Sequence, residues 1–198
     1  MEISPEALAD WSLGALVSPL DLLEGLYWTE SFALPGRSGG YFLELIERII
    51  QQLKENAPLI EDTWVASHVN TVIPELEAFA RAAHGVREWV ETNFSKKMRA
   101  VHHQAVRQGG PQIPPWHDNP DYQLIFQKST AAFARYLDVL SLAIPVIRER
   151  LSPDSLASYS VQLDRASERL PDLRLVLKVG YPEAFRIRAG ERGVLPPA

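Results

Sequence analysis

Residues 74–108 read PELEAFARAAHGVREWVETNFSKKMRAVHHQAVRQ, and this stretch decides the predicted fold. Its apolar residues recur three or four positions apart, at Leu76, Phe79, Ala83, Val86, Val90, Phe94, Met98, Val101 and Ala105. Because an α-helix turns once in about 3.6 residues, these positions form one continuous stripe along a helix. The spacing predicts a helix over about 74–108, roughly 50 Å long at about 1.5 Å per residue. We expect it to be the central helix of a bundle.

The sequence on both sides of this stretch is helical in pattern as well. Upstream, Ile46, Ile49, Ile50 and Leu53 repeat the same spacing. Downstream, Asn119 precedes Pro120 and Asp121, which is the order expected at a helix start, and Ser152 with Pro153 repeats it. Pro145 is expected to bend or interrupt the helix that begins at Pro120. The fold class is therefore all-α, a multi-helix bundle around one long central helix.

The C-terminal segment has a different pattern. In LRLVLKV, Leu173, Leu175, Leu177 and Val179 alternate with other residues, which is the period of a β-strand. A single strand needs a pairing partner, so it must pair with FRIRA at 185–189, pair with another chain, or not form at all. We therefore divide the chain into a helical bundle domain at 1–170 and a strand-like tail with a flexible C-terminus at 171–198.

The composition excludes several classes of protein. The chain has 198 residues, 46% of them hydrophobic, no cysteine and a net charge of −5. The missing cysteines remove disulfides and thiolate ligands, and the negative charge argues against general nucleic-acid binding. The short basic cluster Lys96, Lys97 and Arg99 is interpreted as a solvated helix face. No secretory signal pattern opens the chain and no unbroken apolar stretch reaches the roughly 20 residues that span a bilayer. We expect a cytoplasmic protein without nucleic-acid or membrane partners.

The polar stretch from His102 to Asp121 contains the highest density of side chains that could bind a ligand or a metal. It reads HHQAVRQGGPQIPPWHDNPD and supplies the candidate ligand-binding residues His102, His103, Trp116, His117, Asp118 and Asp121. Adjacent helical residues lie about 100° apart, so His102 and His103 cannot both face one metal. One histidine with a carboxylate suits Zn²⁺ or Fe²⁺, and a single histidine suits haem. The other interpretation is a helix junction with a polar cap, and no metal-ligand set is assigned.

Two functions from different classes remain open. In the first, the chain is a helical binding or accessory subunit that docks a partner protein or peptide through a groove or through its C-terminal strand. Leu173, Leu175, Leu177 and Val179 would then complete a sheet in the partner. In the second, it is a small-molecule enzyme or a metal or haem carrier, with an aromatic-lined pocket and a histidine-centred site. The identity of any cofactor and the question of enzymatic activity stay open between them. A purely structural or homo-oligomeric role is a further possibility.

Overall fold

The fold is a bundle of helices. The computed structural model describes residues 37–61, 63–108 and 115–179, together with Ala7, Ala15 and Ile187. Its elements are α3 (Arg37–Asn56), the 3-10 turn η2 (Ala57–Leu59), α4 (Thr63–Asn93), α5 (Lys96–Arg107), α6 (Pro120–Arg150) and α7 (Pro153–Val179). Every element in these ranges is helical, so the predicted all-α bundle is confirmed.

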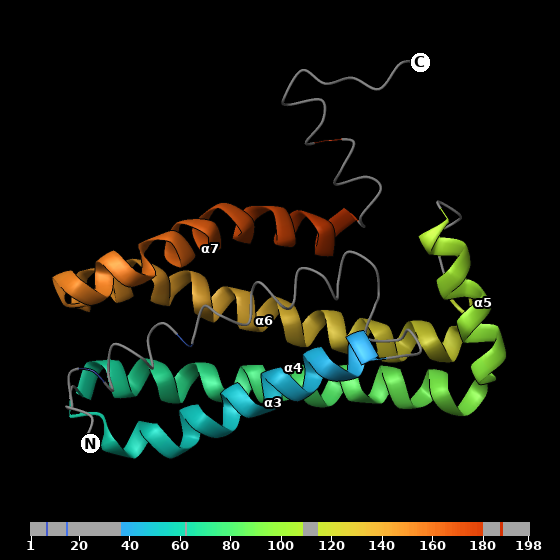
Figure 1. Cartoon of the computed structure of the whole chain (residues 1–198), viewed down its shortest axis with the longest axis horizontal. Coiled ribbons are helices and arrows are strands. Elements are labelled where there is room, and N and C mark those ends of the chain that lie inside the picture. Colours follow the sequence, from blue (N-terminus) through green and yellow to red (C-terminus); the bar gives the residue numbers. More distant parts are fainter. Residues whose placement is uncertain are drawn as a thin grey trace.

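Four of the helices lie side by side in the order α3, α4, α6 and α7, while α5 crosses one end of the bundle (Figure 1). α6 is the long central helix, because it packs against both α4 and α7. Consecutive long helices run in opposite directions (Figure 1). The bundle therefore has an up-and-down order, in which Leu151 and Ser152 form a short turn between α6 and α7, whereas the connection from α4 to α6 contains α5.

The core lies mainly between α4 and α6. The Phe79 ring of α4 contacts the Phe133 ring of α6, with centroids 5.2 Å apart, and both side chains are fully buried. Tyr136 is also fully buried, and this burial raises the pKa of its hydroxyl above the usual value. Burying one such large side chain contributes about 1.5–3 kcal/mol. The α4–α6 pair is thus the main source of stability in the described part.

The predicted central helix at about 74–108 is wrong in both of its bounds. α4 begins at Thr63 and runs through Pro74, and it ends at Asn93. Phe94 and Ser95 are not helical and separate α4 from α5. The Ser95 hydroxyl accepts a hydrogen bond from the Met98 amide (3.3 Å), so Ser95 caps α5. The apolar stripe divides at this point. Its first part, through Val90, is buried, whereas Met98 and Val101 on α5 are exposed.

The predicted strand at Leu173–Val179 is also wrong, because these residues form the last turns of α7. Leu170, Leu173 and Leu177 continue the helical spacing of three and four, and Leu170 and Leu173 are buried against the core. α7 runs without a break through the predicted domain boundary at residue 170. The rest of the tail, apart from Ile187, lies outside the described residues.

Pro145 does not interrupt α6, which continues to Arg150. Within the described ranges, α6 is long and apolar enough to cross a membrane by length and composition alone, and 41% of its apolar stretch is buried. The central helix of a bundle meets the same criterion, because its apolar side chains are covered by neighbouring helices. Here α6 lies between α4 and α7.

Candidate functional site

An aromatic–histidine cluster lies at the end of the bundle where α4, α5 and α6 meet. Trp116, only 1% exposed, contacts the Phe94 ring (5.2 Å between centroids) and meets the His102 ring edge-on (5.6 Å). Tyr122 contacts Trp89 at 5.6 Å and the His117 ring at 6.4 Å. The aromatic–histidine cluster consists of Trp89, Phe94, His102, Trp116, His117 and Tyr122.

The structure brings three of the predicted ligand-binding residues into this cluster: His102, Trp116 and His117. Asp118 and Asp121 are exposed to solvent, and the Asp121 amide donates to Asn119 Oδ1 (2.9 Å). His103 belongs to α5, but its side chain lies outside the described part. Among the described residues, no group of three or more histidine and carboxylate side chains is placed to hold a metal ion. The predicted helix junction with an asparagine cap is therefore present in this stretch.

Two donors in this region are buried without an acceptor among the described residues. They are the indole Nε1 of Trp116 and the guanidinium Nε of Arg99. Arg99 lies one turn before His102 on α5, and its Nη1 pairs with Glu91 at 3.4 Å. A buried donor without an acceptor costs about 1–3 kcal/mol. Within the cluster, the Trp116 indole is therefore a donor that could bond to an acceptor supplied by another molecule.

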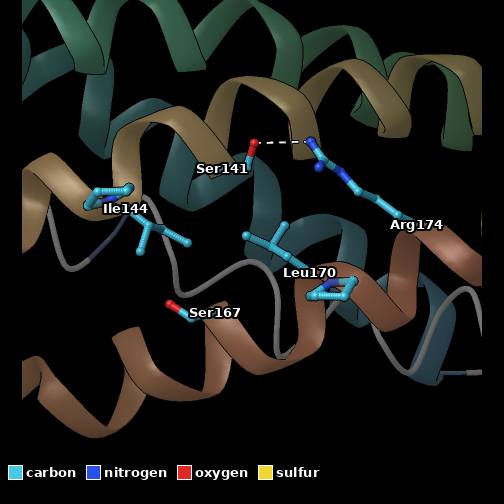
Figure 2. Close-up of a pocket in the computed structure, with 7 residues that line it drawn as sticks. Ser141, Ile144, Ser167, Leu170 and Arg174 are labelled. Atoms are coloured by element: carbon cyan, nitrogen blue, oxygen red, sulfur yellow. Dashed lines mark hydrogen bonds between the residues drawn. The ribbon is translucent and has the colours of Figure 1, made fainter. Parts of the chain in front are cut away.

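A second candidate site is the groove between α6 and α7, which we call the α6–α7 groove. Its cavity volume is about 470 Å³, and Figure 2 shows side chains of both helices reaching into it. The lining residues are Ser141, Ile144, Pro145, Ser167, Leu170, Pro171 and Arg174. Ile144 and Leu170 are buried and form the apolar floor, while serine hydroxyls and Arg174 form the polar edge.

The polar edge of the α6–α7 groove is held by bonds within the chain. Arg174 Nη2 donates to Asp138 Oδ1 (2.6 Å) and to Ser141 Oγ (3.0 Å), the bond drawn in Figure 2. The Ser141 hydroxyl donates to the Asp138 carbonyl (2.8 Å), and the Ser167 hydroxyl donates to the Leu163 carbonyl (2.9 Å). Both serine hydrogens are therefore used inside their own helices, and the remaining hydroxyl lone pairs are acceptors.

A smaller hollow of about 340 Å³ lies between α3 and α4. Glu47, Glu77 and Glu88 line it, together with Arg81 and His84. Glu77 pairs with Lys54 (2.7 Å) and with Arg81 (3.9 Å), and His84 Nε2 lies 2.9 Å from Glu47 Oε1. Exposed ion pairs of this kind contribute about 0–1 kcal/mol each, so the hollow is a solvated surface of the bundle.

Sequence reasoning missed the α6–α7 groove, although the sequence contains a signal for it. The two helices carry the same pattern, a serine four residues before a proline, as SLAIP at 141–145 and SERLP at 167–171. Each pattern taken alone predicts only a helix with a proline inside it. The packing of α6 on α7 places both patterns in one groove, and that relation is not visible in the sequence.

The chain matches no family model, and no curated protein or solved structure is similar to it. The fold and the two sites define an all-α bundle with an interhelical groove and a buried aromatic–histidine cluster. Any functional assignment therefore rests on the chemistry of these sites.

Proposed function

We propose that the protein is a helical binding module that docks a segment of a partner protein in the α6–α7 groove. The observation that carries the proposal is the groove itself, with an apolar floor at Ile144 and Leu170 beneath a polar edge. Its volume of about 470 Å³ falls within the range of about 300–1,000 Å³ typical of ligand sites. It is large enough for one or two side chains of a docked segment.

The chemistry of the groove suits a protein segment better than a small anion. Arg174 would be the natural anion ligand, but its guanidinium is bonded to Asp138 and Ser141. The Asp138 carboxylate bonded to Nη2 offsets the charge of this cation, which weakens its attraction for an anion. An apolar side chain packed on Ile144 and Leu170, with polar groups at the edge, matches the recognition of peptides in grooves between helices.

The helical conformation of Leu173–Val179 argues against docking by strand pairing. Leu173 is buried within α7, and Leu177 is packed against the core, so neither is presented as a strand edge. A docking role for this segment would require the end of α7 to unfold. The groove needs no such rearrangement.

A selection from a library of random peptides displayed on phage tests this function. The selected peptides are measured against the wild-type chain and against Ser167→Trp, which fills the groove. Val161→Trp, an exposed position of α7 outside the groove, is the matched control. We expect binding to fall at least about tenfold in Ser167→Trp and to be unchanged in Val161→Trp. Equal binding to both variants, or no selected binder, would overturn the proposal.

A second candidate function, a carrier or enzyme for a small aromatic ligand, is favoured by the aromatic–histidine cluster. The specific observation is the buried Trp116 indole, whose N–H finds no acceptor among the described residues. An oxygen atom of a ligand stacked among these rings would accept this bond. Absorption spectroscopy and elemental analysis of protein purified without chelator test it. A flavin or haem band is expected, with iron in the haem case; a clean, metal-free spectrum together with an unchanged Trp116 environment on adding aromatic acids counts against it.

A further inference from the structure

We propose that the α6–α7 groove selects a primary ammonium group, the side chain of a lysine in the docked segment. The backbone carbonyls of Ser141 and Ser167 would receive it. This inference rests on the proposed function and names the chemistry that the groove recognises. Two prolines, Pro145 and Pro171, line the groove.

Each proline removes one hydrogen bond from its own helix. In an α-helix the amide of residue i donates to the carbonyl of residue i−4, and proline has no amide hydrogen. Pro145 therefore cannot donate to Ser141, and Pro171 cannot donate to Ser167. Both serines line the same groove as the prolines, and we infer that the two carbonyls that lack their usual helical donor face it.

The hydroxyls of these serines add further acceptors. Because both hydroxyl hydrogens are donated to carbonyls of the same helix, the hydroxyl oxygens act as acceptors toward the groove. The Ser141 oxygen already receives Arg174, whereas the Ser167 oxygen has capacity for a second partner. The edge of the groove is therefore rich in acceptors, and Arg174 is the donor among its lining side chains.

A primary ammonium group matches this edge. It carries three donors and no acceptor, and a lysine stem of four methylenes packs on apolar surfaces while its head reaches polar atoms. Ile144 and Leu170 supply the apolar surface beneath the acceptors. The charge of Arg174 would repel a second cation, but Asp138 lies 2.6 Å from it and neutralises the pair. A carboxylate ligand would meet acceptors on both walls.

An NMR titration of the full-length, nitrogen-15-labelled chain tests the inference. The probes are Nα-acetyl-lysine N-methylamide and its norleucine analogue, which has a similar stem without the ammonium group. Butylamine is a third probe, and it shows whether the site accepts an ammonium group that carries no peptide backbone. We expect the lysine probe to shift the amides of Ile144 and Leu170 and to bind at least about fivefold more tightly than the norleucine probe.

Three proline variants supply the decisive comparison. Pro145→Ala restores the amide that donates to the Ser141 carbonyl, and Pro171→Ala restores the one that donates to the Ser167 carbonyl. Each variant should therefore bind the lysine probe more weakly and have a higher urea midpoint of unfolding. Pro74→Ala in α4 is the matched control, since it restores the bond to Asn70 outside the groove. It should raise the urea midpoint and leave probe binding unchanged.

The results separate the inference from the proposed function. Equal binding of the lysine and norleucine probes, or unchanged lysine binding in both groove variants, would overturn the inference even if selected peptides bind the groove. Binding of butylamine without binding of the lysine probe would mean that the site excludes a peptide backbone, which overturns the proposed function and keeps the ammonium site.

Discussion

Pro145 on α6 and Pro171 on α7 line the same groove, and each follows by four residues a serine that lines it as well. A proline inside a helix costs about 3 kcal/mol relative to alanine. The bundle carries both prolines at one helix–helix contact, which places two weakened turns opposite each other. We infer that both prolines have a role in the groove, because each one lowers helix stability but leaves a carbonyl oxygen in the groove wall without its helical donor.

The Arg174–Asp138 pair is expected to position the groove edge without stabilising the fold appreciably. The two side chains are 46% and 68% exposed, so solvent screens their attraction. We expect Arg174→Met to lower the free energy of unfolding by less than about 1 kcal/mol, measured by urea denaturation. A double-mutant cycle with Asp138→Asn isolates the pair, and a coupling energy well above about 1 kcal/mol would contradict this view.

Two leucines on α6 provide a test of the bundle core. Leu140 is fully buried, whereas Leu142 is 74% exposed. Leu140→Ala removes the same atoms as Leu142→Ala but leaves a cavity, so we expect a loss of about 2–5 kcal/mol against less than about 0.5 kcal/mol. Thermal denaturation of both variants checks this. Similar losses in the two would mean that α6 does not face α4 and α7 as described.

The cap of α6 is expected to contribute measurably to stability. Asn119 Oδ1 accepts the amides of Asp121 (2.9 Å) and Tyr122 (3.3 Å), and no intrahelical partner exists for amides in a first turn. Asn119→Ala should cost about 0.5–2 kcal/mol in urea denaturation. Asn119→Ser, which keeps a capping oxygen, is the control and should retain most of the stability; a loss as large as that of the alanine variant would argue against the cap.

Gly85 lies within α4, and a Cβ atom there would meet no heavy atom within 4 Å. Gly85→Ala should therefore stabilise the chain by about 0.5–1 kcal/mol, because glycine loses more conformational freedom on folding. The reverse change at an exposed helical position, Ala131→Gly in α6, should cost a similar amount. A destabilised Gly85→Ala would show that this surface of α4 is covered in solution.

Local sequence signals predicted the helices best where capping and spacing agree. Asn119 and Pro120 mark the start of α6 in both the sequence and the structure. The break after Asn93 was missed because the apolar spacing continues across Phe94 and Ser95, so the stripe alone could not show that α5 leaves the core. Ser95 is a local signal for a helix start, but the nine regularly spaced apolar residues of the stripe are a stronger signal for one continuous helix.

The strand prediction failed because two periods coincide at Leu173 and Leu177. These residues fit an alternation of two, and they also continue the spacing of three and four from Leu163, Ala166 and Leu170. Packing on α6 decides between the two periods, since it buries Leu170 and Leu173 on one helix face. Nearness in sequence brings His102 and Trp116 to one corner of the bundle, whereas a ligand-binding role for these residues stays a prediction. The α6–α7 groove could not be predicted from local sequence, because it forms only where α6 packs on α7.

The most direct test of the docking role is to map the amide chemical shifts of the full-length chain on adding the tightest selected peptide. Docking in the α6–α7 groove predicts the largest shifts on both of its walls, at Ser141, Ile144, Ser167 and Leu170. Largest shifts on α5, around Met98 and Val101, or around Trp116 in the aromatic–histidine cluster, would contradict it and move the binding site to the other end of the bundle.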